Sequence, residues 1–424
     1  MRFKTFLAIA LAAVFFPLHL TAQPGQSPSD CSDTTVGLTP LTEFGANLYQ
    51  GFPGGLYPGG NNTRPQAHDS AGLQLVVQVL PRDAAGNIDP VNGKVVLLSI
   101  GMSNTTQEFS VFKSLADADP EKNPKLVIVD GAQGGQTAAT ISDSNAAFWS
   151  VIDQRLNTGG VTRSQVQAAW IKEASANPNQ AFPVHAQILE DQFVTIAGIL
   201  RGRYPNLVVS YWSSRIYAGY ANTTLNPEPY AYESGFSIRW MIERQINGDP
   251  ALAYDGVNPR VPWISWGPYL WADGLNPRAD GLIWECANFQ SDGTHPSPSG
   301  RMKVANMLVD FFKSDSTTRP WFVDASTTSV HLGTVPPATA TLEQNYPNPF
   351  NPGTTIEFSI PSAQFVMLKV YNLLGQEVVT LVNGLQTAGV HSVQWNASSL
   401  STGFYFYKME TGKFSQTRKL MLMK

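Results

Sequence analysis

Short apolar segments alternate with longer amphipathic segments between residues 73 and 312, and this order constrains the fold more than any other feature of the chain. Apolar runs rich in β-branched residues and bounded by turn residues occupy 73–80, 95–100, 126–129, 166–171 and 207–211. Helical spacing of apolar residues follows at 186–203, 235–246 and 299–312. Strands that alternate with helices form parallel sheets through right-handed crossovers. We therefore predict an α/β domain with three α/β/α layers and a mainly parallel sheet.

The composition changes after Trp321. Residues 323–341 are rich in Ser, Thr, Ala and Pro, which is typical of an extended linker. From residue 354 onward, apolar and polar residues alternate, as at 355–360 and 366–371, with Gly or Asn turns between the segments. This pattern predicts a small antiparallel β-sandwich at the C-terminus.

The N-terminus predicts export. Arg2 and Lys4 precede an apolar run over residues 6–16, which ends in the small-residue exit of residues 20–22. We interpret residues 1–22 as a cleaved signal peptide. No other segment approaches about 18 uninterrupted apolar residues, so we expect a soluble mature protein without a transmembrane segment. In an oxidising compartment the two cysteines, Cys31 and Cys286, are expected to form a disulfide, with two free thiols as the alternative.

The charge balance argues against a nucleic-acid partner, and the placement of the histidines argues against a metal site. The chain has 28 Lys and Arg against 32 Asp and Glu, without a long run of either sign. This balance argues against nucleic acid as a partner. His68, beside Asp69, and His185 lack the close ligand spacing of a zinc or iron site, so we predict no catalytic metal and no cofactor.

A carboxylate precedes a histidine by three residues in the turn-rich segment Ser291-Asp292-Gly293-Thr294-His295-Pro296. That spacing lets Asp292 orient His295, which can then act as a general base. The hydroxyl that such a base would activate is predicted to be Ser103, where the strand over 95–100 ends. A serine at a strand end is more often a turn former, so the prediction depends on all three residues together.

These segments resemble, in their order along residues 90–312, the SGNH (GDSL-like) hydrolases. The sequence Ile100-Gly101-Met102-Ser103-Asn104 is most similar to the Gly-x-Ser-Asn block of the sialate O-acetylesterase and acetylxylan esterase branch. The resemblance implies that Ser103 is the nucleophile, that His295 is its base and that Asp292 orients the histidine.

An acyl-transfer site also needs donors for the developing oxyanion. We expect these from the backbone of Ser103 and from Gly135 or Gly134, in the segment that takes the place of the family's glycine block, although a turn that serves only packing is an equal alternative. The family's third donor is an Asn or Gln side chain, and Lys172 and Glu173 stand in its place. Lys172 would stabilise an oxyanion by charge, whereas a Lys172–Glu173 pair that never meets substrate is the structural alternative.

Substrate contacts are expected at the carboxyl edge of the sheet. Arg215, which follows the strand over 207–211, could hold a carboxylate or a sugar hydroxyl, or could pair instead with Glu228 or Glu233. The remaining predicted substrate-binding residues are Glu173, Tyr217 and Trp271. Trp271 belongs to a set of rings before the Asp292–His295 loop, of which at least one is expected to wall the pocket, namely Trp263, Trp266, Tyr269 and Trp271.

Residues 342–424 resemble the C-terminal sorting domain of the type IX secretion system, found in the Bacteroidetes and their relatives. The resemblance is carried by four motifs, LEQNYPNPFNP at 342–352, VYNLLGQ at 370–376, GFYFY at 403–407 and KLMLMK at 419–424. It implies export by the type IX machinery across the outer membrane, followed by release or surface attachment. A carbohydrate-binding or adhesive sandwich is the alternative.

We therefore expect a signal peptide (1–22), an SGNH-like hydrolase domain (23–322), a linker (323–341) and a sorting domain (342–424). The expected function is that of a secreted serine esterase that removes acyl groups, above all acetyl, from an extracellular polysaccharide or glycoconjugate. The unusual Lys172-Glu173 block motivates one alternative, a non-catalytic carbohydrate-binding protein on the same scaffold. A lipid or polyester hydrolase ranks lower, because the loops lack a long aliphatic lid.

Overall fold

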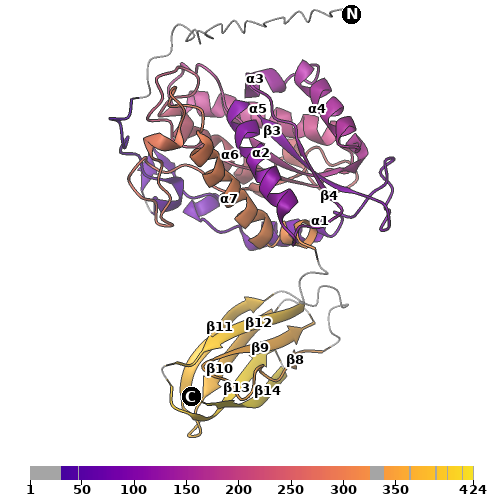
Figure 1. The fold of residues 1–424 in the computed structure, drawn as a ribbon, viewed down its shortest axis with the longest axis vertical. Helices are drawn as coiled ribbons and strands as arrows, with labels where there is room; N and C mark the ends of the chain where they lie inside the picture. The colour runs from indigo at the N-terminus through magenta and orange to yellow at the C-terminus, as the bar shows by residue number, and fades with distance from the viewer. Residues whose placement is uncertain are drawn as a thin grey trace, which may run out of the picture. The chain divides into compact units, whose positions relative to one another are not determined.

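The structure is a computed structural model that describes residues 30–324, except residue 46, and residues 339–423, except 362–363, 387–388, 399 and 413. The predicted signal peptide and most of the predicted linker lie outside these residues. The chain divides into two compact units after Asp324, and each is described by itself (Figure 1).

A five-stranded parallel sheet forms the centre of the first unit, in the order β4-β3-β5-β6-β7. The strands are β3 (Val95–Gly101), β4 (Leu126–Asp130), β5 (Val166–Lys172), β6 (Val209–Trp212) and β7 (Trp263–Trp266). Every residue of β3 and β5 is buried. The strand order is that of a doubly wound sheet whose direction of winding reverses between β3 and β5, the place where such sheets bind ligands.

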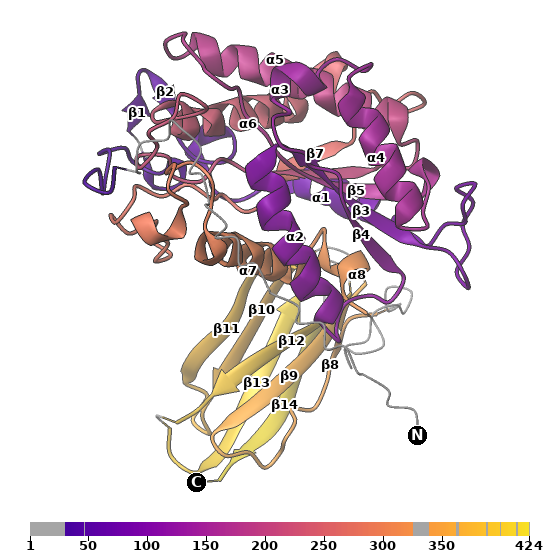
Figure 2. The ribbon, with the colours of Figure 1, turned by 45° about the horizontal axis from the view of Figure 1, so that its top comes forward.

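Helices cover both faces of this sheet (Figure 2). Phe109 of α2 stacks on Trp170 of β5, whereas Phe193 of α5 packs against Trp212, on the opposite face. The first face carries α1 (Gln66–Val76), α2 (Ser103–Ala118) and α7 (Pro298–Ser314). The second face carries α4 (Ala147–Thr158), α5 (Val184–Arg203) and α6 (Tyr230–Ile246). The unit also contains two short helices, α3 (Ala138–Ile141) and α8 (Arg319–Phe322), and a two-stranded antiparallel sheet of β1 (Leu48–Tyr49) and β2 (Phe52–Pro53). The predicted α/β class with a parallel sheet is confirmed.

One predicted strand is wrong. Residues 73–80 were expected to be extended, but α1 covers Gln66–Val76. The helix begins directly after Pro65, and its Gly72 lies so close to the ring of Trp263 that a Cβ atom would come within 2.5 Å of Cζ2. The strand β7 was also missed, because Trp263–Trp266 lies in a segment rich in Pro and Gly.

Two antiparallel sheets form the second unit, in the orders β11-β10-β13-β14 and β12-β9-β8. They enclose one apolar core that includes Ile356, Leu368, Tyr407 and Leu420. The predicted antiparallel alternation is confirmed. The strands are β8 (Thr341–Leu342), β9 (Gly353–Ile360), β10 (Gln364–Tyr371), β11 (Glu377–Gln386), β12 (Gly389–Asn396), β13 (Gly403–Thr411) and β14 (Phe414–Leu422).

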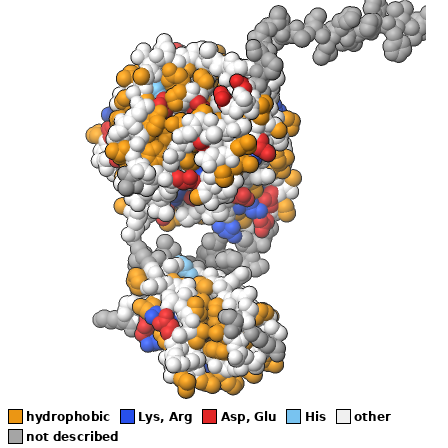
Figure 3. Space-filling model, turned by 90° about the vertical axis from the view of Figure 1, so that its left-hand side faces the viewer, with side chains coloured by type: hydrophobic (Ala, Val, Ile, Leu, Met, Phe, Trp, Pro, Cys, Tyr) orange, Lys and Arg blue, Asp and Glu red, His pale blue; other side chains and the backbone are white. Residues whose placement is uncertain are grey.

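The surface mixes charges of both signs. On the face drawn in Figure 3, Lys and Arg side chains are interspersed with Asp and Glu among hydrophobic and uncharged groups. Among the described residues, no helix has the length and apolar character needed to cross a membrane.

Candidate active site

Ser103 is placed by a tight turn between β3 and α2. β3 ends at Gly101, whose backbone packs so closely against β5 that a Cβ atom would lie 2.2 Å from the carbonyl oxygen of Lys172. After Met102 the chain enters α2, and Ser103 is the first residue of that helix. Because the first N–H groups of a helix have no acceptor inside it, the backbone N–H of Ser103 is left to bind another group.

Ser103, His295 and Asp292 form one hydrogen-bonded series. Ser103 Oγ lies 2.8 Å from His295 Nε2, and His295 Nδ1 lies 2.5 Å from Asp292 Oδ2. Since a carboxylate can only accept, His295 donates through Nδ1, and its Nε2 is left to accept the proton of the Ser103 hydroxyl. The structure thus brings the three predicted catalytic residues together, although 192 positions separate Ser103 from His295.

The loop that carries Asp292 and His295 is held by its own backbone. Asp292 Oδ1 accepts hydrogen bonds from the N–H groups of Thr294 (3.0 Å) and His295 (2.9 Å). Burial alone would raise the pKa of Asp292, but the hydrogen bonds from His295 and Thr294 lower it to about 2. Asn104 Nδ2 donates to the carbonyl oxygen of Thr294 at 2.9 Å, which ties this loop to α2. Asp292 is therefore ionised and fixed beside the histidine.

A cavity of about 280 Å³ adjoins Ser103 and His295. Its walls come from the segments that follow β3, β4, β5 and β6 and from the His295 loop, so it occupies the carboxyl edge of the sheet. The lining residues are Met102, Ser103, Asn104, Gly135, Thr137, Ala176, Arg215, Leu225, Asn226, Thr294 and His295.

Of the two predicted oxyanion glycines, Gly135 lines this cavity and Gly134 does not. Gly135 has a φ of +75°, a conformation that favours glycine. Gly134 is close by, since a Cβ atom on it would lie 3.8 Å from Ser103 Cβ. Of the predicted oxyanion donors, Ser103 and Gly135 therefore line the cavity.

The structure does not bring Lys172 to the cavity. Its side chain is fully buried, and its Nζ binds both carboxylate oxygens of Glu108 on α2. Burial lowers the pKa of Lys172 to about 8 even beside that carboxylate. The predicted oxyanion role of Lys172 does not fit this geometry, and the alternative Lys172–Glu173 pair is wrong because the partner of Lys172 is Glu108.

Glu173 is also buried and does not line the cavity. Its Oε1 accepts from the backbone N–H of Ala174, and burial raises its pKa well above the usual range of a carboxyl. The predicted substrate contact of Glu173 is therefore not supported by its position.

Among the other predicted substrate-binding residues, only Arg215 lines the cavity. The hydroxyl of Tyr217 donates to the carbonyl oxygen of Asp33, and Trp271 Nε1 donates to Glu228 Oε1, so both rings belong to the core. None of the rings expected to wall the pocket lines it, namely Trp263, Trp266, Tyr269 and Trp271.

Outside the motifs quoted from the sequence, four lining residues were missed, namely Thr137, Ala176, Leu225 and Asn226. The signal that could have found Asn226 was its place in a polar loop that follows β6 at the carboxyl edge of the sheet. Across the described part of the chain, His, Cys, Asp and Glu side chains do not gather in threes as a metal site would require.

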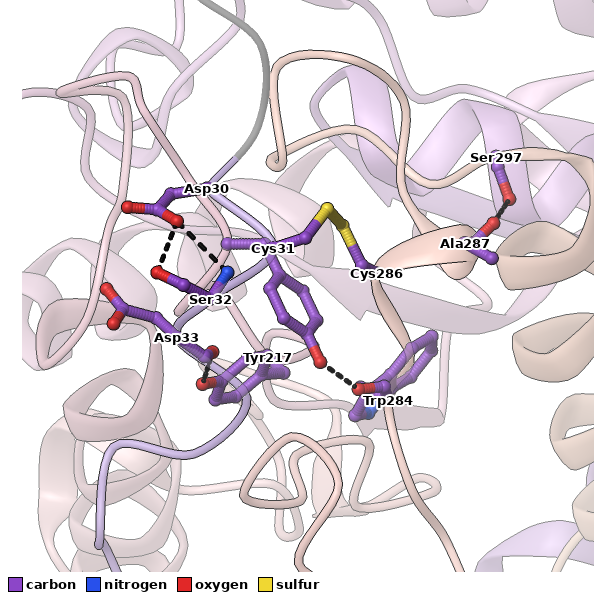
Figure 4. Close-up of a disulfide and its surroundings, with 10 residues drawn as sticks. Asp30, Cys31, Ser32, Asp33, Tyr217, Trp284, Cys286, Ala287 and Ser297 are labelled. Atoms are coloured by element: carbon purple, nitrogen blue, oxygen red, sulfur yellow. Dashed lines mark hydrogen bonds between the residues drawn. A yellow bond between two sulfur atoms is a disulfide. The ribbon is translucent and has the colours of Figure 1, made fainter.

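Cys31 and Cys286 form the predicted disulfide, with Cα atoms 5.5 Å apart (Figure 4). The bond joins the start of the described chain to the 3-10 helix Cys286–Asn288, shortly before Asp292. Tyr217 adds a second tie to the same N-terminal segment through its 2.8 Å hydrogen bond to Asp33. The segment that leads into the histidine loop is therefore anchored covalently.

Residues 344–423 match the family model described as "Secretion system C-terminal sorting domain". The second unit is a type IX sorting domain. It marks the protein for type IX export, followed by secretion or attachment to the cell surface. No curated protein matches the chain.

Three solved structures match the chain weakly. The surface component PorZ of the Porphyromonas gingivalis type IX system is 20% identical over 20% of this chain, with a TM-score of 0.16, and the match spans only 11% of PorZ. An endo-β-1,4-mannanase from Thermotoga petrophila is 8% identical, with a TM-score of 0.22 and 78% of each chain covered. A Cellulomonas fimi endo-β-1,4-mannanase double mutant is 11% identical, with a TM-score of 0.18, and covers 84% of this chain and 98% of its own. Similarities this low carry no functional argument.

Proposed function

We propose that the first unit is an SGNH-type serine esterase that removes acyl groups, above all acetyl, from a polysaccharide or glycoconjugate outside the cell. The observation that carries the proposal is the series from Ser103 Oγ to His295 Nε2 (2.8 Å) and from His295 Nδ1 to Asp292 Oδ2 (2.5 Å) at the edge of a cavity. The doubly wound strand order and the Gly-x-Ser-Asn block of residues 101–104 add support.

In the proposed mechanism, His295 Nε2 takes the hydroxyl proton of Ser103 while Oγ forms a bond to the ester carbonyl carbon. The carbonyl oxygen becomes an oxyanion, which the backbone N–H groups of Ser103 and Gly135 would receive. When the tetrahedral species collapses, the ester C–O bond breaks and His295 gives its proton to the leaving alcohol. A water molecule, deprotonated by the same histidine, then releases the carboxylic acid and restores Ser103.

The setting of the site supports a small acyl group on an extracellular substrate. The cavity volume of about 280 Å³ lies just below the range of about 300–1,000 Å³ typical of ligand pockets. The type IX sorting domain directs the protein to the outside of the cell, which is consistent with an extracellular polysaccharide or glycoconjugate as substrate.

One observation favours a second function, a non-catalytic carbohydrate-binding protein. The end of β5 supplies no side-chain donor to the cavity, because Lys172 is held by Glu108. An oxyanion would then depend on backbone donors and on groups outside β5.

Hydrolysis of 4-nitrophenyl acetate and of acetylated xylan by the mature protein tests the proposal. We expect Ser103→Ala to lower kcat/KM at least about 10⁴-fold, with an unchanged circular dichroism spectrum. Ser150→Ala, at an exposed position of α4, is the matched control and should keep wild-type activity. Activity retained in Ser103→Ala would refute the nucleophile, and a wild-type protein inactive on both substrates would favour the binding function.

A further inference from the structure

Arg215 is a buried cation in the wall of the catalytic cavity. Its side chain is 3% exposed, and neither Nε nor Nη1 has a hydrogen-bond partner among the residues that the structure describes. A guanidinium keeps its proton in proteins, so these N–H groups cannot become acceptors or neutral. Buried donors without a partner are costly, so an acceptor oxygen from a bound molecule would stabilise them.

The carboxylates predicted to pair with Arg215 are engaged elsewhere. Glu228 accepts from Trp271 Nε1 (2.8 Å) and from the backbone of Ala218 (2.9 Å) and Tyr232 (3.0 Å). Glu233 accepts from the Tyr49 hydroxyl at 2.5 Å and lies in contact with the ring of His185. Arg215 lines the cavity and feels the charges of Glu108, Glu173 and Glu228, but it forms no hydrogen-bonded ion pair among the described residues.

Asn226 offers the opposite polarity in the same cavity. Its side chain is 3% exposed, and its Nδ2 donates to the carbonyl oxygen of Ser175 at 3.2 Å. Because a carbonyl oxygen can only accept, this bond fixes the orientation of the amide. Asn226 Oδ1 is then buried without a partner in the described chain. Two residues that line the cavity thus carry buried polar atoms without a partner, donors on Arg215 and an acceptor on Asn226.

A hydroxyl group has both polarities that these two residues lack, because it accepts through its oxygen and donates through its hydrogen. A carboxylate would satisfy Arg215, but it would bring a second acceptor against Asn226 Oδ1. The pair of unpartnered groups therefore favours a neutral hydroxyl over an acid.

We propose that Arg215 and Asn226 form a subsite that binds a free hydroxyl on the alcohol part of the substrate, next to the ester that Ser103 attacks. This inference rests on the proposed esterase function and narrows its substrate to acylated polyols such as sugar units with an unesterified neighbouring hydroxyl. A substrate without that hydroxyl would leave both buried groups unpaired. Sites built to bind a hydroxyl reject such analogues strongly, by factors of about 10⁴ in favourable cases.

The test compares two synthetic esters, a methyl mono-O-acetyl-xylopyranoside with a free neighbouring hydroxyl and its deoxy analogue. For the wild-type protein we expect kcat/KM to be at least about 100-fold higher for the hydroxylated ester. Arg215→Met and Asn226→Leu should each reduce this preference at least tenfold. Arg239→Met, which removes a buried arginine of α6 that does not line the cavity, is the matched control and should keep the wild-type preference.

Several results would overturn the inference. A wild-type preference below threefold, or one that survives in both variants, would exclude the subsite. A preference for acetylated polygalacturonate over acetylated xylan that disappears in Arg215→Met would show recognition of a carboxylate instead. If Arg215→Met does not fold by circular dichroism, Arg215→Lys and Asn226→Leu carry the comparison.

Binding measurements separate this inference from the proposed function. If the wild-type protein hydrolyses no ester, the esterase proposal fails, and calorimetry with the Ser103→Ala protein and the same two glycosides becomes decisive. Tighter binding of the hydroxylated glycoside, lost in Ser103→Ala with Asn226→Leu, would support the subsite without catalysis. Equal binding of the two glycosides would overturn the subsite as well.

Discussion

The ends of β3 and β5 lie side by side, with Gly101 paired to Lys172, yet the two strands end in opposite environments. After β3 the chain turns and presents Ser103 to a cavity and to His295. At the end of β5, the side chain of Lys172 is sealed between the sheet and α2 by Glu108. Position at the carboxyl edge of a parallel sheet therefore does not make a residue part of the site. What decides is whether the side chain is held by a protein partner inside the core, as Lys172 is by Glu108, or lines the cavity, as Ser103 does.

The largest expected effect is a loss of catalytic rate when the Ser103–His295–Asp292 series is broken. Asp292→Asn should lower kcat for ester hydrolysis about 10⁴-fold, because an amide can donate to His295 Nδ1 and favour the wrong tautomer. The measurement is the steady-state rate on 4-nitrophenyl acetate, with the fold checked by circular dichroism. A loss below tenfold would mean that Asp292 does not orient the base.

The buried ion pair of Lys172 and Glu108 should contribute to the stability of the fold rather than to catalysis. Glu108→Leu leaves Lys172 buried without its partner and is expected to reduce the free energy of unfolding by about 3–5 kcal/mol. Urea denaturation measures this change.

The double variant Glu108→Leu with Lys172→Met is the matched control. It should recover most of the loss, since two apolar side chains can replace a buried ion pair at little cost. Equal destabilisation of the single and double variants would show that Lys172 does not depend on Glu108.

The disulfide should have a somewhat smaller effect. Cys31→Ser with Cys286→Ser is expected to lower the free energy of unfolding by about 2–4 kcal/mol, because the bond closes a loop of 255 positions that would otherwise be free in the unfolded chain. Thermal unfolding of the variant and the wild type measures the change in Tm. An unchanged Tm would indicate that the N-terminal segment is held by its other contacts.

The last predicted effect is confined to a pH range and comes from Glu228, a carboxyl that interacts electrostatically with Arg215. Burial raises the pKa of Glu228 to about 7 from 4.5, so the folded protein binds this proton more tightly than the unfolded chain does. This contribution to stability is complete below pH 4.5 and is lost as the pH rises through about 7. Because each pKa unit corresponds to about 1.4 kcal/mol, Glu228→Gln should reduce the change in unfolding free energy between these two pH values by up to about 3 kcal/mol.

Urea denaturation at pH 4.5, 6 and 8 for the wild type and the variant gives the slope of the free energy of unfolding against pH. Glu173, whose pKa is also raised by burial, acts in the same direction, so part of the slope should remain in Glu228→Gln. Identical slopes for the two proteins would contradict the assignment to Glu228.

The sequence predicted the triad because its chemistry depends on local features that can be recognised in order. Asp292 and His295 lie within one turn, and Ser103 follows a buried strand. Most buried strands were predicted for the same reason. The segment over 73–80 was not, because a short apolar run has the same composition in a buried helix as in a strand.

The rest of the site depends on contacts between distant segments. No local pattern indicates that Glu108 on α2 would capture Lys172, 64 positions away, or that Tyr217 and Trp271 would turn into the core. Asn226 was missed because its neighbours in the cavity come from segments after three other strands.

Labelling with a fluorophosphonate tests the central claim most directly, because it detects an activated serine without knowledge of the natural substrate. We predict a single phosphonyl adduct on Ser103 by peptide mass spectrometry of the mature protein, and loss of labelling in Ser103→Ala and His295→Ala. An unlabelled wild-type protein, or an adduct on another serine, would contradict the assignment of Ser103 as a nucleophile activated by His295.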